Sequence, residues 1–328
     1  MTTDRPFTRG AGVISALLAL SALHPAAAQD AYPSHPIRVV VPYSAGGTGD
    51  VLGRLMAQQL TAAFNQQAIV DNRPGAGGHI GADLVAKSPA DGYTLALGAI
   101  GTHAGGAMYK SLPYDPIKDL VAITVIAEVP NVVIVHPSVP VHDIREFVAT
   151  AKAEPGALNF GSAGNGTSTH LGGELFKLVA GVNLTHVPYR GSAPALNDLI
   201  AGQIQCMFEN IPTVPPHAKS GAVRALAVTS RTRVAALPDV PTVMESGVPD
   251  YEATAWFTIA GPAGLPKPVL DKLSAVLMQA IASPAISQQI RELGAVPVGG
   301  SLDATRAFVA AETEKWTKVI VAAKITVE

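Results

Sequence analysis

Apolar positions along this chain alternate between two periods. The β-branched run Ile37–Val41 is strand-like, and after a Gly-rich stretch the apolar residues return at helical spacing, as one face of a helix of about 14 residues. The residues of that face are Val51, Leu52, Leu55, Met56, Leu60 and Ala63. The same order recurs where the strand-like 158–160 run precedes a helical stripe at 171–179. Strands that alternate with helices in this way predict an α/β fold.

Two turns rich in small residues connect these strand and helix patterns, Tyr43–Asp50 and Gly161–Thr169. The first amides of a helix have no partner within it and carry partial positive charge, so such a turn can hold an anion. Neither Tyr43–Gly49 nor Phe160–His170 contains Lys or Arg. Each turn alone could be a plain strand-to-helix connection, but two of them predict a small anion held between two helix N-termini.

Four other side chains are candidates for ligand contact, and a purely structural role or an exposed loop position is the alternative for most of them. Asp50 begins a helix, so its carboxylate either caps that helix or contacts the ligand. Thr102 and His103 follow the strand-like 94–98 run, at the strand end where α/β proteins bind ligands, although His103 could be an exposed loop histidine. Trp256 either lines a cleft or packs in the core.

Motifs of several enzyme classes are missing from the sequence. The dinucleotide-binding pattern Gly-x-Gly-x-x-Gly is incomplete, because Leu52 stands where its third glycine would be. Asp71, at the end of the second strand-like run, would be suitably placed to bind a ribose. No phosphate loop and no Gly-x-Ser-x-Gly nucleophile motif occurs. The nine histidines are scattered. We therefore expect no catalytic residues, no cofactor and no metal site.

Residues 1–28 have the pattern of a secretory signal peptide. Arg5 and Arg9 precede an apolar run at 11–23, and Ala26–Ala28 forms a small-residue cleavage site. Loss of this segment removes two basic residues and Asp4, which leaves 21 basic and 24 acidic residues. This balance gives no indication of nucleic-acid binding or membrane insertion. We expect a periplasmic protein of two domains that is not anchored to lipid.

Several motifs, in order along the chain, are shared with a known family. They are Asp71–Gly78, Ala90–Leu95, Ser162–Thr167 with His170-Leu171, Val187–Gly191, Leu237–Thr242 and Gly261–Pro266, after the Pro-x-x-Ala-Gly-Gly-x-x-Asp opening at 42–50. Together they resemble the Bug family, the extracytoplasmic solute receptors of tripartite tricarboxylate transporters. The resemblance covers essentially the whole mature chain.

This resemblance implies a two-domain periplasmic-binding-protein fold that closes like a flytrap around its ligand. With crossovers at 131–138 and 254–260, we expect domain one to comprise residues 36–132 and 258–328, and domain two residues 133–257. The family pattern also places a ligand carboxylate at 44–48, at Ser162 and at 164–167. Glu209 stands where that pattern leads us to expect Asp.

We therefore predict a monomeric periplasmic receptor for a small carboxylate (a di- or tricarboxylate, aromatic acid or amino acid) that serves membrane permease subunits. The alternatives are an α/β enzyme acting on a small carboxylate or phosphate, and a sensor that presents ligand to a membrane kinase. The predicted ligand-binding residues are Tyr43, Ser44, Ala45, Gly46, Gly47, Thr48, Asp50, Thr102, His103, Ser162, Gly164, Asn165, Gly166, Thr167, Tyr189, Asn210 and Trp256.

Overall fold

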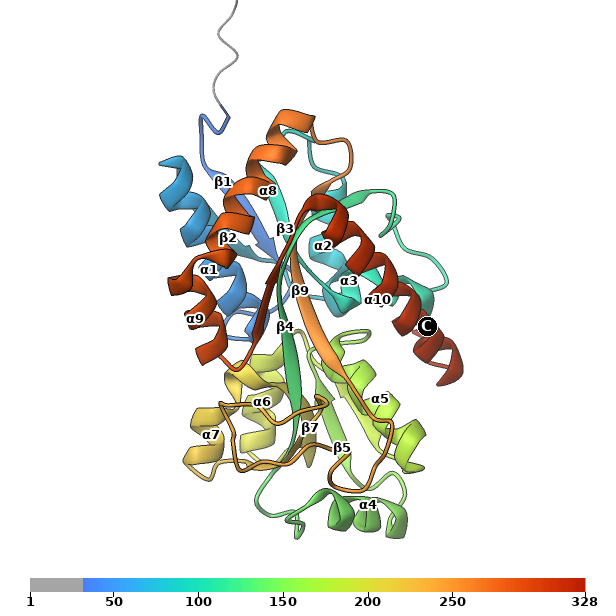
Figure 1. Ribbon diagram of the computed structural model, residues 1–328. Coiled ribbons are helices and arrows are strands. Elements are labelled where there is room, and N and C mark those ends of the chain that lie inside the picture. Colours follow the sequence, from blue (N-terminus) through green and yellow to red (C-terminus); the bar gives the residue numbers. More distant parts are fainter. Residues whose placement is uncertain (1–31, 328) are drawn as a thin grey trace, which may run out of the picture.

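The computed structural model of the protein describes residues 32–327 and contains two lobes joined by a pair of long strands (Figure 1). The predicted signal peptide, residues 1–28, lies outside the described residues. Within them, strands and helices alternate as the sequence pattern predicts, and the fold is the expected two-lobed α/β architecture. No single helix in the described part of the chain has the length and apolarity to cross a bilayer; only the bent helix pair Lys267–Ala282 and Pro284–Glu292 meets those criteria jointly.

The first lobe contains the parallel strands β1, β3 and β2, together with the antiparallel strand β10. Its elements are β1 (Ile37–Val41), α1 (Thr48–Phe64), β2 (Ala68–Asn72), η1 (Ala76–Gly78), α2 (His79–Ala86), β3 (Thr94–Ala99), α3 (Ile100–His103), η2 (Gly105–Met108), α8 (Lys267–Ala282), α9 (Pro284–Glu292), β10 (Val296–Gly299) and α10 (Leu302–Ala322).

The second lobe has β7 beside β5, and β5 beside β6, with the antiparallel strand β8 on β4. Its elements are α4 (Ile144–Ala153), β5 (Asn159–Ser162), α5 (Ser168–Ala180), β6 (Thr185–Pro188), α6 (Ser192–Ile200), β7 (Cys206–Asn210), η3 (Ile211–Thr213), α7 (Pro215–Lys219) and β8 (Arg224–Val228).

Two strands, β4 (Leu120–Val135) and β9 (Thr254–Pro262), run side by side through the middle of the molecule (Figure 1). The first part of β4 pairs with β9 and β10, and its last part pairs with β7 and β8. Both strands therefore belong to the connection between the lobes. The expected domain boundaries, 132/133 and 257/258, fall inside these strands and stay a prediction about where the chain flexes.

Although it contains a proline, β4 is one continuous strand of 16 residues. Pro130 lies opposite Thr254, at the end of the ladder with β9. The next residue, Asn131, opens the ladder with β7 opposite Asn210. The proline thus lies where β4 exchanges one partner strand for another, a position that tolerates a residue without an N–H group.

A buried polar network links this exchange point to the second lobe. The side chain of Asn131 is fully buried and donates to the carbonyl oxygens of Ser168, at 3.3 Å, and Phe208, at 3.0 Å. It accepts a hydrogen bond of 2.7 Å from Nδ2 of Asn210. A buried amide side chain without hydrogen-bond partners destabilises the folded state. This network therefore fixes the N-terminus of α5 relative to the crossover strand β4.

Candidate functional site

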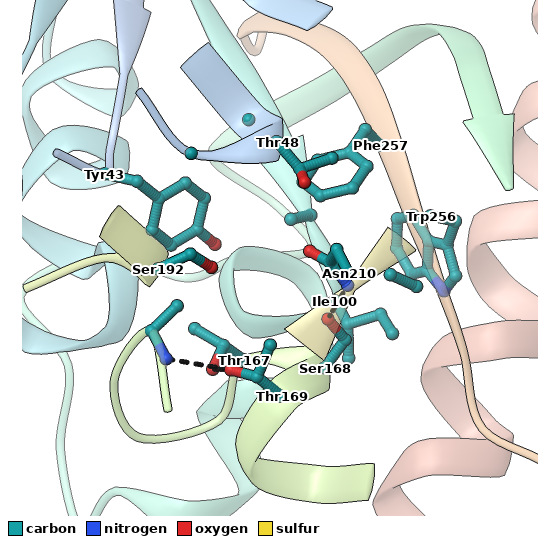
Figure 2. Close-up of a pocket in the computed structure, with 15 residues that line it drawn as sticks. Tyr43, Thr48, Ile100, Thr167, Ser168, Thr169, Ser192, Asn210, Trp256 and Phe257 are labelled. Carbon is teal, nitrogen blue, oxygen red and sulfur yellow. Dashed lines mark hydrogen bonds between the residues drawn. The ribbon is translucent and has the colours of Figure 1, made fainter. Parts of the chain in front are cut away.

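A small cavity lies between the lobes, where the predicted Gly-rich turns meet (Figure 2). Its volume is about 20 Å³, room for about one water molecule. The lining residues come from the first lobe, the second lobe and the return crossover, and they include no Lys, Arg, His, Asp or Glu. They are Tyr43, Gly47, Thr48, Gly49, Ala99, Ile100, Ala163, Thr167, Ser168, Thr169, Ser192, Asn210, Ala255, Trp256 and Phe257.

The N-termini of three helices converge on this cavity. Residues of the first turn of α1 (Thr48, Gly49) and of α5 (Ser168, Thr169) line it, as does Ser192, the first residue of α6. In none of these helices does the N-cap side chain accept a hydrogen bond from a backbone amide of the first turn. The first amides of a helix have no intrahelical partner, so three sets of N–H groups and three positive dipole ends are directed at one point.

Neutral side-chain donors supplement these amides. The hydroxyl groups of Tyr43 and Thr48 and the indole Nε1 of Trp256 are buried, and within the described residues they have no hydrogen-bond partner. Figure 2 shows the two hydroxyl groups directed toward the middle of the cavity. Burial raises the pKa of Tyr43, so its phenol stays protonated and can donate. A cavity lined with unpaired donors and no fixed negative charge suits an anion.

Contacts between the two lobes close the cavity on both sides. The amide of Ser44 donates to the carbonyl oxygen of Arg190 at 3.1 Å. On the other side Gly77, with φ of +63°, lies so close to the carbonyl oxygen of Asn165 that a Cβ atom would overlap it. Only glycine fits both the conformation and the contact at position 77. In this arrangement of the lobes the cavity has room for about one water molecule and for no larger ligand.

Asp50 organises the first turn and does not line the cavity. Its carboxylate accepts hydrogen bonds from the Gly46 amide and from Arg54 Nε, each at 3.0 Å, and from Asn72 Nδ2 at 3.0 Å. Burial alone would raise the pKa of Asp50, but these donors outweigh it and hold the pKa below its ordinary value. Of the two roles considered for Asp50, its contacts match the structural one.

The second turn is held in shape by two stacked histidines. Nδ1 of His170 accepts a hydrogen bond of 3.0 Å from the Gly166 amide, and Nε2 of His186 lies 2.6 Å from Ser162 Oγ. The two rings stack with centroids 3.9 Å apart. Burial lowers the pKa of both imidazoles, which keeps His170 neutral and able to accept from the turn. Gly164 completes the arrangement by donating to Ser162 Oγ at 3.1 Å.

Six of the predicted ligand-binding residues line the cavity: Tyr43, Gly47, Thr48, Thr167, Asn210 and Trp256. The other eleven do not: Ser44, Ala45, Gly46, Asp50, Thr102, His103, Ser162, Gly164, Asn165, Gly166 and Tyr189. Most of these lie in the same two turns, behind the lining residues. Direct ligand contact stays a prediction for all seventeen residues.

The side chains of Thr102, His103 and Tyr189, like those of Asp50 and Ser162, form hydrogen bonds away from the cavity. The Thr102 hydroxyl bonds the backbone of Ala99 within α3, and Nε2 of His103 lies 3.2 Å from Thr258 Oγ1. The Tyr189 hydroxyl donates to Asp198 at 2.7 Å. The 94–98 strand does end at the cleft, but the chain turns at once into α3, so that Ile100 lines the cavity and His103 does not.

Sequence reasoning missed the third helix N-terminus, at Ser192. The stretch before it, Tyr189–Gly191, contains one glycine and gave little indication of an anion-binding turn. It also missed Gly49, Ser168 and Thr169, because α1 and α5 begin three residues before the apolar stripes, which start at Val51 and Leu171.

Glu209 lies immediately behind Ser192. It is fully buried, accepts a hydrogen bond of 2.9 Å from Thr213 Oγ1, and has one carboxyl oxygen without a partner in the described structure. Burial raises the pKa of Glu209, whereas the neighbouring Thr213 and Ser192 hydroxyl groups lower it. The net pKa is about 7. Its protonation therefore changes near neutral pH, next to the cavity wall.

Comparison with known proteins identifies the family. A family model described as "Tripartite tricarboxylate transporter family receptor" matches residues 52–325. The chain belongs to this receptor family. A relative within the Bug group is BugT of Bordetella pertussis, 36% identical over 315 residues, which span 95% of this chain and 97% of BugT.

Solved structures resemble this receptor over nearly its full length. Rpa4515 of R. palustris, solved with adipate, is 40% identical with a TM-score of 0.87, and the match covers 90% of this chain and 99% of Rpa4515. MatC (Rpa3494) from Rhodopseudomonas palustris, solved with bound malate, is 30% identical with a TM-score of 0.84, over 88% of this chain and 100% of MatC. The fold is that of periplasmic solute-binding proteins, as the sequence motifs predicted.

The buried carboxyl group of Glu209 leads to a prediction about how the stability of the receptor depends on pH. Its pKa is 4.5 ordinarily and about 7 in the folded receptor. Between these values the folded state binds more protons than the unfolded state, so stability falls as pH rises. We expect Glu209→Gln to gain about 2–3 kcal/mol in free energy of unfolding over wild type between pH 5 and pH 8.

Urea unfolding of both proteins at the two pH values measures this difference. The histidines with lowered pKa act in the opposite direction, but equally in both proteins, so the difference isolates Glu209. The exposed glutamate variant Glu154→Gln is the matched control and should follow wild type. If the stability of wild type and of Glu209→Gln changed in parallel with pH, the raised pKa of Glu209 would be contradicted.

Proposed function

We propose that this chain is a periplasmic receptor that captures a small carboxylate in the cleft between its lobes. The observation that carries the proposal is the convergence of three uncapped helix N-termini on a cavity without charged side chains. The adipate and malate in the structures of two relatives support a dicarboxylate as the ligand class. As a receptor, the protein returns its ligand chemically unchanged.

The available donors are sufficient for tight binding without an arginine in the cavity. A helix N-terminus stabilises an anion by about 0.3–1 kcal/mol, and by up to ~2 kcal/mol when partly buried. A hydrogen bond to a charged group contributes about 1.5–3 kcal/mol. Three termini with a few such bonds reach the roughly 8 kcal/mol that corresponds to micromolar affinity.

Capture requires the lobes to open and close about β4 and β9. We propose that residues 36–132 with 258–328 move as one body and residues 133–257 as the other. The cavity of about 20 Å³ supports this, because a dicarboxylate cannot enter while the Ser44–Arg190 and Gly77–Asn165 contacts hold the lobes together.

We further propose the cellular setting that the sequence predicts. Residues 1–28 direct export and are removed, and the mature monomer delivers its ligand to the membrane permease subunits of a tripartite tricarboxylate-type transporter. The family membership supports this setting.

The hydroxyl of Tyr43 tests the site directly. We expect Tyr43→Phe to weaken the binding of adipate or malate by roughly 10- to 100-fold, because it removes one hydrogen bond to a charged group. Isothermal titration calorimetry measures the change. Tyr189→Phe is the matched control: its hydroxyl bonds Asp198 and not the cavity, so its affinity should stay within about threefold of wild type.

Two outcomes would contradict the proposed function. One is that the wild-type receptor binds neither these acids nor any other small carboxylate in a screened panel. The other is that Tyr43→Phe, shown to be folded by circular dichroism, binds as wild type does while Tyr189→Phe does not.

A disulfide across the cleft tests the need for opening. A Cβ atom on Gly47 would lie 3.4 Å from Ser192 Cβ, close to the roughly 3.5–4.5 Å of disulfides, and the φ of −84° at Gly47 accommodates cysteine. We expect the oxidised Gly47→Cys/Ser192→Cys receptor to lose dicarboxylate binding and to recover it on reduction.

Two controls show whether loss of binding comes from the cross-link or from the substituted side chains. They are the reduced double variant and each single variant under oxidising conditions. Cys206 is buried and does not interfere. If the cross-linked protein, with its disulfide confirmed by mass spectrometry, binds as well as its reduced form, the ligand does not enter by separation of the lobes.

A further inference from the structure

A second, larger cavity lies in the first lobe, away from the cleft. It has a volume of about 450 Å³, within the range typical of small-molecule sites. Helix α10, the start of β4 and the segment before it form its walls, and in Figure 1 α10 runs beside α3 at this place. The walls are mostly apolar and include Pro116, Ile117, Leu120, Val121, Val309 and Ala310.

His103 provides a buried polar group in this cavity. Its side chain lines the cavity, and the residue is only 6% exposed. Nε2 lies 3.2 Å from Thr258 Oγ1. Burial lowers the pKa of His103 to about 4, so the ring is neutral at physiological pH. The cavity therefore offers two uncharged hydrogen-bonding side chains, His103 and Thr313, among mostly apolar walls.

The charged residues at the rim do not favour an ion. Arg306 pairs with Asp303 at 3.3 Å, and Glu314 pairs with Lys318 at 2.7 Å. The two rim residues have opposite charges and both are exposed to solvent. An ionic molecule in this cavity would lose hydration without a buried counter-charge. An uncharged molecule has no such cost.

The wall behind His103 is shared with the cleft. The His103 and Trp256 rings contact each other with centroids 5.3 Å apart, and Trp256 lines the cleft cavity. Trp256 also contacts Phe308 of α10, with centroids 5.7 Å apart. A molecule in the second cavity would thus be separated from a ligand in the cleft by one layer of aromatic rings.

We propose that this cavity is a second ligand site, which takes an uncharged aromatic molecule with one amine or hydroxyl group. The ring system packs against the apolar walls, and the polar group bonds His103. The site is distinct from the carboxylate cleft in position and in chemistry, and its occupation does not depend on the function proposed for the cleft.

The neutral fluorescent amine N-phenyl-1-naphthylamine is a suitable probe, because its emission rises in apolar surroundings. We expect saturable binding by the wild-type protein, with one probe per chain. Val309→Trp and Ala310→Trp fill the cavity from α10 and should each weaken binding at least tenfold. Val321→Trp makes the same kind of change on the same helix, at a residue that is 67% exposed and outside the cavity, and should bind as wild type does.

Two results would overturn the proposal. Absence of saturable binding by the wild-type protein would show that the cavity does not take this class of molecule. Unchanged affinity in either filling variant, with a native circular dichroism spectrum, would show that the probe binds elsewhere. The use of two filling variants keeps the test decisive if one of them does not fold.

Discussion

The unpaired amides at the start of α1, α5 and α6 are the constraint on which the rest of the site depends. Each helix leaves its first N–H groups without partners, and burying such groups together is costly unless an acceptor meets them. In this receptor the two lobes bring the three N-termini to one cavity and add the hydroxyl groups of Tyr43 and Thr48. An anion would satisfy these donors together, and we therefore propose that ligand binding and lobe closure are coupled.

The surrounding residues maintain this convergence without entering the cavity. Asp50 holds the first turn, the stacked pair His170 and His186 holds the second, and Asn131 ties α5 to the crossover strand. Because these groups are buried and paired, the donors keep their positions when no ligand is present. Such preorganisation reduces the ordering cost of binding.

Much of this arrangement follows from local sequence. The strand–turn–helix order at 37–64 and 158–180 was evident from apolar spacing, and the lack of basic residues in both turns indicated binding by backbone amides. What local pattern could not reveal was long-range: that α6 brings Ser192 to the same cavity, that Pro130 lies where β4 changes partners, and that His103 faces away from the cleft. The starts of α1 and α5 also lie three residues before the apolar stripes, because the stripe marks the buried face and not the first turn.

The central claim is that backbone amides, and not cationic side chains, hold the ligand. Nuclear magnetic resonance of the ¹⁵N-labelled receptor during titration with a dicarboxylate tests this most directly. We expect the amide protons of Thr48, Gly49, Ser168, Thr169 and Ser192 to shift downfield on binding, while the guanidinium signals of Arg54 and Arg190 change little. Large shifts of either guanidinium, with those five amides unmoved, would contradict it.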